Sequence, residues 1–116
     1  MKKYTVAFTL LGLIPLMLSA ETILSSKTTI SKIYTYKSAA VVELHKTMKK
    51  NSGCTYGKSG KYIALRFNDE GSKQMFSAIL SAYISNSKVR FGTSGCDSIW
   101  KSVGTMNKIY RVTLEK

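Results

Sequence analysis

The sequence predicts a mainly β domain that contains one helix and one disulfide. Three observations predict it. Five short segments are rich in β-branched and aromatic residues or alternate polar with apolar side chains, as strands do. One longer segment repeats its apolar residues with helical spacing. Two cysteines lie well after an apolar N-terminal run. The 116 residues suffice for one small domain.

The helix is predicted over residues 70–84. Its apolar positions recur at i, i+3, i+4 and i+7, so they share one face. They are Phe76, Ile79, Leu80 and Tyr83. The opposite face is mostly small and polar, and it carries Lys73, Ser77 and Ser81.

The ends of this helix also have sequence signals. Asp69 and Glu70 lie where the helix dipole favours carboxylates. Asn68 or Ser72 can cap the first turn, and residues 86–87 end the helix.

The predicted strands are residues 29–36, 39–45, 62–67, 88–91 and 107–114. Residues 21–28 are expected to form an extended arm, and residues 46–61 and 92–104 to form loops. The resulting order, β-β-β-α-β-β, is that of the OB-fold, a five-stranded, partly open Greek-key barrel. An open βββαββ sheet is the competing arrangement. The barrel is favoured because a single helix cannot cover the whole buried face of an open sheet.

The first twenty residues are predicted to be a signal peptide. A basic start is followed by an apolar run and then by a small residue suited to cleavage between Ala20 and Glu21. A membrane anchor is the alternative, but Pro15 and the shortness of the run disfavour it. The mature domain, residues 21–116, is therefore expected to be secreted or periplasmic, with no membrane span after cleavage.

Cys54 and Cys96 are the two cysteines. In an oxidising compartment an even pair in so small a domain predicts one disulfide. The closed loop of some forty residues would stabilise the fold by ~4 kcal/mol on chain-entropy grounds. Free thiols and a zinc site are weaker alternatives, because these cysteines and the one histidine match no zinc spacing.

The chain is strongly basic. Its formal net charge is +12, and it remains +10 after Lys2 and Lys3 leave with the signal peptide. Such a domain attracts polyanions. For an exported protein these are acidic glycans, lipopolysaccharide, anionic membranes or extracellular nucleic acid. The alternative is that the lysines serve solubility alone.

One block of sequence has a family resemblance. It comprises the helix MFSAILSAYISNSKV, the strand VRF, the turn GTSGC and the partner cysteine Cys54. The block resembles small exported bacterial proteins similar to the B subunits of A–B toxins, especially the subtilase cytotoxin type. The resemblance implies an OB-fold, export, an internal disulfide, glycan recognition and a homo-oligomeric, pentameric ring in which the helix lines the pore. It leaves any A-type partner subunit unknown. The hydroxyl-rich residues 25–29 lie near a sugar-contacting serine of that type, whereas the toxins' other sugar-binding loop residues have no counterpart here.

Nothing in the sequence predicts an enzyme, a metal site or a cofactor. Residues 53–59, GCTYGKS, look like a phosphate loop, but the glycine spacing is one residue short and a strand follows instead of a helix. His45 has no visible nucleophile or orienting partner. Asp69 and Glu70 are better explained by the helix start.

Two groups of residues are candidates for binding. Trp100 and the adjacent Lys101 suit sugar stacking and capture of an acidic group. The alternative is that Trp100 plugs one end of the barrel beside the disulfide. A second group alternates outward on the last two predicted strands and could form a basic stripe, or simply a solvated strand face. It comprises Lys88, Arg90, Lys108 and Arg111.

Two main hypotheses of function follow. The first is an exported binding module for a glycan or another anionic surface group. The second is a nucleic-acid-binding OB domain that stacks bases on Tyr34, Tyr36 and Tyr110. The signal peptide favours the first, because an exported protein seldom meets intracellular nucleic acid. A secreted inhibitor or structural partner of another protein is a third reading.

Overall fold

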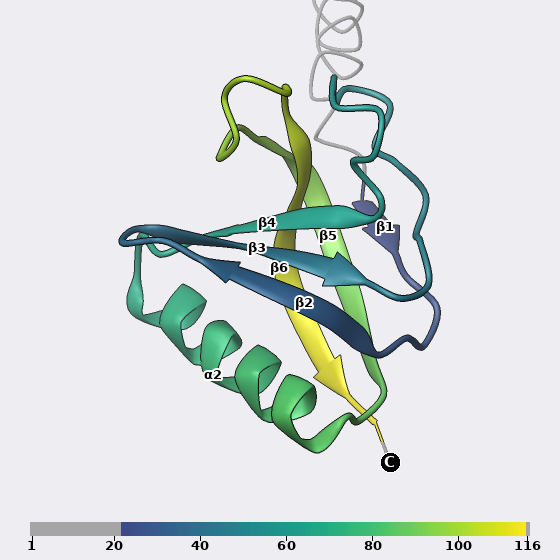
Figure 1. The fold of residues 1–116 in the computed structure, drawn as a ribbon, viewed down its shortest axis with the longest axis vertical. Coiled ribbons are helices and arrows are strands. Elements are labelled where there is room, and N and C mark those ends of the chain that lie inside the picture. Colours follow the sequence, from purple (N-terminus) through teal and green to yellow (C-terminus); the bar gives the residue numbers. More distant parts are fainter. Residues whose placement is uncertain (1–21, 116) are drawn as a thin grey trace, which may run out of the picture.

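The computed structural model describes residues 22–115 (Figure 1). The predicted signal peptide and its cleavage site between Ala20 and Glu21 lie outside the described residues. The described chain contains six strands and one helix, so the mainly β composition with one helix is confirmed.

The six strands form one mixed sheet in the order β1-β5-β6-β4-β3-β2. The strands are β1 Thr22–Leu24, β2 Ile30–Thr35, β3 Ala39–Leu44, β4 Tyr62–Arg66, β5 Val89–Asp97 and β6 Met106–Leu114. All neighbours are antiparallel except β4 and β6, which run parallel and pair at Ala64 and Lys108. The sheet curves strongly, and α2 (Glu70–Ser85) lies along one side of it (Figure 1).

The strand prediction differs from the structure at two places. Residues 22–24, expected as part of an extended arm, form β1, which pairs with β5 from Thr22–Ser94 to Leu24–Gly92. The predicted strand 88–91 continues to Asp97, because β5 stays paired with β6 across two register shifts. Neither extension has an alternating apolar pattern, so the pairing partner and not the local sequence decides it.

The segment between β1 and β2 also bonds to β5. The backbone amides and carbonyls of Thr28 and Val89 exchange two hydrogen bonds of 3.0 and 2.8 Å. The amide of Ser25 donates to the carbonyl of Phe91 at 2.8 Å, and the Ser25 hydroxyl accepts from the Phe91 amide at 2.8 Å. The chain is therefore held against β5 both before and at the entry to β2.

The helix begins with a capping box. Asp69, and neither Asn68 nor Ser72, is the N-cap: its carboxylate accepts from the Ser72 amide at 2.8 Å, while the Ser72 hydroxyl accepts from the Asp69 amide at 3.3 Å. This arrangement satisfies two backbone donors that the first turn leaves free. Asn86 ends the helix in the left-handed conformation, with φ of 54°.

The buried face of α2 is narrower than the sequence predicts. Ile79 and Ala82 are buried and Phe76 is half-buried, whereas Tyr83 is 41 % exposed. The opposite face has Lys73, Ser77 and Ser81 exposed, as the spacing predicts. The main hydrophobic core lies between α2 and the inner face of the sheet and includes residues of every strand. Its members include Ile23, Ile30, Val42, Leu44, Ile63, Leu65, Ile79, Phe91 and Ile109.

The predicted disulfide is confirmed. Cys54 bonds to Cys96 and so joins the loop 46–61 to the C-terminal end of β5. A buried polar network fixes the same loop, centred on Asn107 of β6. Its side-chain oxygen accepts from the Asn51 amide and the Ser59 hydroxyl, both at 2.8 Å. The Asn107 side-chain amide donates to the Lys49 carbonyl at 3.0 Å. Because every buried side-chain nitrogen and oxygen of the described residues has a hydrogen-bond partner, the loop is held without regular secondary structure.

Candidate ligand-binding site

Trp100 lies in the loop of residues 98–105 that joins β5 to β6. This loop folds back over the outer face of β2, β3 and β4, which is the face turned away from the main core. A turn closed by the Val103 amide and the Trp100 carbonyl, 3.0 Å apart, shapes the loop tip. The position of Trp100 is thus set by the loop between β5 and β6 and not by a helix or strand.

The indole of Trp100 meets four tyrosines there, and we call the five residues the aromatic cluster. They are Tyr34, Tyr36, Tyr56, Tyr62 and Trp100. The ring centroids of Trp100 and Tyr34 are 5.0 Å apart and nearly perpendicular, at 88°. Those of Trp100 and Tyr62 are 5.3 Å apart. The indole Nε1 donates to the Tyr36 hydroxyl at 2.6 Å. Edge-to-face contacts and a satisfied indole N–H together fix the orientation of the ring.

The floor of the aromatic cluster consists of small and flexible side chains. Val41, Ala64 and Met106 are completely buried beneath the rings. The strand register explains this, because Tyr34 pairs with Val41 and Val41 pairs with Ala64 on neighbouring strands. Side chains in register share a face of the sheet, so the small residues leave room for the large rings.

Three tethers hold the Trp100 loop in place. At one end, Arg66 of β4 donates two hydrogen bonds to the Asp97 carboxylate, at 2.6 and 3.1 Å. This contact, above all its hydrogen bonds, holds the pKa of Asp97 below its ordinary value. At the same end, the Cys54–Cys96 disulfide fixes the preceding residue.

The other end of the loop is held by Thr105. Its hydroxyl accepts from the Thr55 amide, and its own amide donates to the Thr55 hydroxyl, both at 2.9 Å. Gly104 beside it has φ of +117°, and a Cβ there would lie 2.5 Å from the Thr55 hydroxyl oxygen. A glycine is therefore required for this close approach.

Charged groups surround the aromatic cluster. The Lys32 ammonium lies 5.6 Å from the centroid of the Tyr34 ring, within cation–π range. The Lys61 ammonium forms an ion pair with the Glu43 carboxylate, at 3.8 Å. Partial burial, and secondarily the Glu43 carboxylate, raise the pKa of Tyr62 above its ordinary value. Lys101 is exposed next to Trp100. The surface thus offers ring faces, hydroxyls and cations together.

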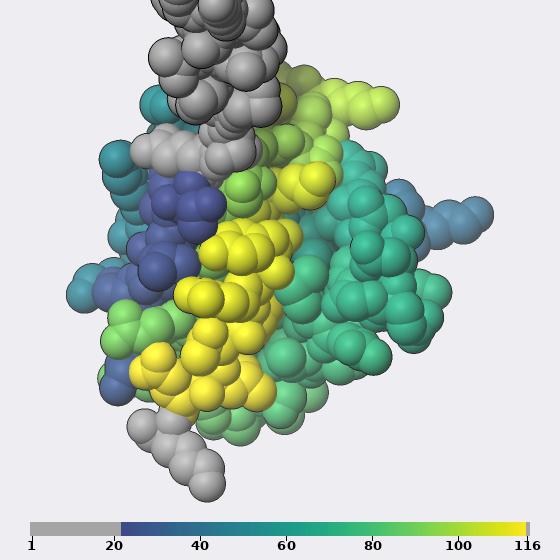
Figure 2. Space-filling model, turned by 180° about the vertical axis from the view of Figure 1, so that it is seen from behind, coloured from purple at the N-terminus to yellow at the C-terminus, as the bar shows by residue number. Residues whose placement is uncertain are grey.

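The predicted basic stripe lies on a different part of the surface. Its strands β5 and β6 are neighbours, as expected, and β6 crosses the face seen in Figure 2 between β1 and α2. Arg90, however, donates to Glu115 at 2.6 Å, and Lys27 pairs with the same carboxylate at 3.3 Å. These hydrogen bonds, chiefly that of Arg90, lower the pKa of Glu115. The Arg111 guanidinium lies 5.9 Å from the Tyr110 ring centroid.

The structure therefore separates the sequence candidates. It brings Trp100 together with Tyr34 and Tyr36, whereas no ring contact links Tyr110 to the aromatic cluster within residues 22–115. Lys88 and Lys108 are exposed, and Lys108 lies on β6 opposite Ala64 of β4. Tyr56, Tyr62 and Lys32 also belong to this surface, although the sequence alone does not mark them as candidates. The alternation of Lys32, Tyr34 and Tyr36 along one strand was the available signal, since period-two residues share a face.

The remaining sequence features have structural explanations. Ser59, in the loop that resembles a phosphate loop, is buried and bonded to Asn107. His45 Nδ1 lies 2.8 Å from the Thr29 hydroxyl on an exposed edge. Within the described chain, no group of three acidic, histidine or cysteine residues could hold a metal ion. No helix among these residues is long and apolar enough to span a membrane.

Comparison of the chain with protein-family models, curated proteins and solved structures finds no match.

Proposed function

We propose that the protein is an exported, non-catalytic binding module that recognises a glycan or another anionic surface group, as the B subunits of A–B toxins do. The observation that carries the proposal is the aromatic cluster. A tethered tryptophan and tyrosines, partly open to solvent and flanked by lysines, provide apolar ring faces for sugar C–H groups and cations for an acidic substituent.

The proposal includes closure of the curved sheet into an OB barrel. The parallel pairing of β4 with β6 and the antiparallel meander β2-β3-β4 support it. The two hydrogen bonds between Thr28 and Val89 also support it, since they join the chain just before β2 to β5 and so connect the two sides of the sheet. Slow hydrogen exchange at both amides is the expected result of closure. Rapid exchange at both would contradict it.

Assembly into a ring, pentameric by the same resemblance, is also part of the proposal. The C-terminal half of α2 exposes Tyr83 and Ile84, the latter 80 % exposed, and β6 exposes Leu114. Exposed apolar side chains of this size support a contact between copies of the chain. Light scattering on the purified protein is expected to give a multiple of the protomer mass.

Nucleic acid is the second candidate ligand, because Tyr34 and Tyr36 lie together in the aromatic cluster and could stack bases. Salt separates the two candidates. Binding of single-stranded DNA neutralises several phosphates and falls steeply with salt even when bases stack, whereas sugar recognition through stacking and hydrogen bonds does not.

A glycan array at about 0.15 M salt, where exposed charges more than ~8 Å apart are screened, tests the proposed function. We expect saturable binding to a restricted set of oligosaccharides, retained in Lys88→Gln and lost in Trp100→Ala. A flat array for the folded wild-type protein, or equal loss in both variants, would refute it.

A further inference from the structure

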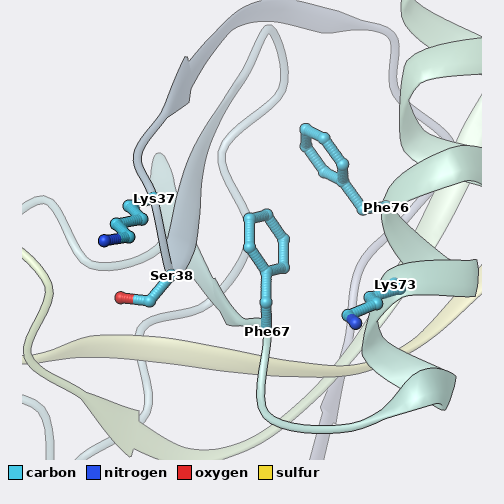
Figure 3. Close-up of a pocket in the computed structure, with 5 residues that line it drawn as sticks. All are labelled: Lys37, Ser38, Phe67, Lys73 and Phe76. Carbon is cyan, nitrogen blue, oxygen red and sulfur yellow. The ribbon is translucent and has the colours of Figure 1, made fainter.

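A second surface feature lies apart from the aromatic cluster, where the turn between β2 and β3 approaches α2. It is an open pocket of about 430 Å³, within the size range of small-molecule sites (Figure 3). Its lining residues come from three segments and are Lys37, Ser38, Phe67, Lys73 and Phe76.

Backbone hydrogen bonds hold the walls of this pocket. The Tyr36 amide donates to the Ala39 carbonyl at 2.8 Å and closes the β2–β3 turn. The Phe67 amide donates to the Ser38 carbonyl at 2.9 Å, so Phe67 is fixed against that turn. The capping box at Asp69 fixes the first turn of α2, and Lys73 there lies at the edge of the polar face, next to Phe76 three residues further on. The pocket is thus built from ordered segments.

The chemistry of the lining is apolar at the base and cationic at the sides. The ring centroids of Phe67 and Phe76 are 4.9 Å apart. Both rings are partly buried and pack against the main core. Figure 3 shows Phe67 between the turn that carries Lys37 and the helix that carries Lys73. These two lysines are the charged residues of the lining, and neither forms an ion pair with any other described residue.

We infer that this pocket binds a small amphiphilic anion. Its apolar body would lie against Phe67 and Phe76, where burial of ring surface is favourable. Its carboxylate, sulfate or phosphate would pair with Lys73 and with Lys37, whose side chain points away from the rings in Figure 3 and would turn toward the anion. The site does not use Trp100 and stands independently of the proposed glycan surface. A bilayer lipid presents the same chemistry, but we assign the pocket to a free amphiphile because five residues enclose only one small apolar body.

Two dyes that differ in charge test this inference. The sulfonate 8-anilinonaphthalene-1-sulfonate is expected to bind with saturable fluorescence at one site per chain. The uncharged N-phenyl-1-naphthylamine has a similar apolar body and is expected to bind more weakly. Equal affinity for both dyes would overturn the inference, because the lysines would then have no role.

Two variants locate the site. Ser38→Trp adds a large side chain at an exposed turn position and is expected to abolish binding of the sulfonate by filling the pocket. Lys37→Gln combined with Lys73→Gln is expected to weaken it roughly fivefold, as for two exposed ion pairs. The matched control, Lys46→Gln combined with Lys58→Gln, removes the same charge from exposed positions elsewhere and is expected to leave the affinity unchanged.

Trp100→Ala separates this inference from the proposed function, because dye affinity is expected to persist in that variant. Dye binding lost in Trp100→Ala and retained in Ser38→Trp would overturn the inference. Phosphatidylglycerol vesicles distinguish the source of the anion: their sedimentation with the protein is expected to be the same for wild type and Ser38→Trp. If Ser38→Trp loses vesicle binding together with dye binding, the pocket takes a bilayer lipid and assignment to a free amphiphile is wrong.

Discussion

The two faces of β2, β3 and β4 are both apolar, but they are built from different residues. On the inner face, Val42, Ile63 and Leu65 are essentially inaccessible and pack with α2 and β5. On the outer face, the buried Val41 and Ala64 are covered by half-exposed aromatic rings. Aliphatic side chains with no polar atoms complete a core, whereas rings with hydroxyls and an N–H can remain in contact with water. The inner face therefore serves stability, whereas the outer face has the ring faces and polar atoms that the proposed binding requires.

The two faces are also covered by different means. A capped helix covers the inner face, and its own hydrogen bonds satisfy its backbone. A loop covers the outer face and depends on tethers from other segments, namely the disulfide, the Arg66–Asp97 pair and the Thr55–Thr105 bonds. Breaking the tethers should therefore affect the outer face first.

The largest effect is expected from removal of the disulfide. Cys54→Ser combined with Cys96→Ser opens a loop closed over 42 residues. Chain entropy predicts a loss of ~4 kcal/mol in the free energy of unfolding. Urea denaturation of the variant and of the wild type measures it. A loss below about 1 kcal/mol would show that the Asn107 network holds the loop alone.

Truncation on the inner face is expected to be next in size. Ile63→Ala leaves a cavity at a residue that is 0 % exposed, which typically costs about 3 kcal/mol. Ligand binding by the folded fraction should be unchanged, because Ile63 points away from the aromatic cluster. Denaturant unfolding and the glycan array, read together, check both parts.

Truncation on the outer face is expected to lower stability less than Ile63→Ala does, but to abolish ligand binding. Trp100→Ala removes a half-buried ring and should lower stability by about 2 kcal/mol, less than for a fully buried tryptophan. Binding should be lost altogether. A variant as unstable as Ile63→Ala or worse, with ligand binding intact, would mean that Trp100 plugs the fold and does not contact ligand.

The smallest expected effect concerns acid stability. Because Arg66 holds the pKa of Asp97 below its ordinary value of 3.8, this carboxylate contributes stability above that pH and loses it as the pH falls through the depressed pKa. Asp97→Asn should therefore flatten the decline in melting temperature below about pH 4. Part of the decline in melting temperature should remain in that variant, because the pKa of Glu115 is also lowered. An unchanged acid profile would show that the Arg66–Asp97 tether contributes nothing.

The sequence predicts the inner face better than the outer one. Helical spacing locates α2 to within a residue at its C-terminal end, and alternation locates β2, β3 and β4. The cysteine pair predicts the disulfide without any geometry. These features can be predicted because they depend on the local pattern of residues or on the number of cysteines, and a single sequence shows both.

What the sequence does not predict depends on contacts between distant segments. The second half of β5 contains glycine, serine and threonine in place of an alternating pattern, and β1 has only three residues, too few for a pattern to show. Pairing with a neighbour makes both of them strands. Trp100 meets Tyr62 because a tethered loop folds back over β4, which no local spacing indicates. Trp100 is a candidate from the sequence, but the sequence connects it only with its neighbour Lys101.

The central claim is that the aromatic cluster is the ligand surface. Trp100 is the one tryptophan of the chain, so its fluorescence reports on that surface alone. The most direct test is to titrate the protein, at about 0.15 M salt, with the oligosaccharide that binds best on the array. We predict a saturable change in Trp100 emission with the same midpoint as binding measured by calorimetry. Calorimetric binding with no change in Trp100 emission would contradict the claim.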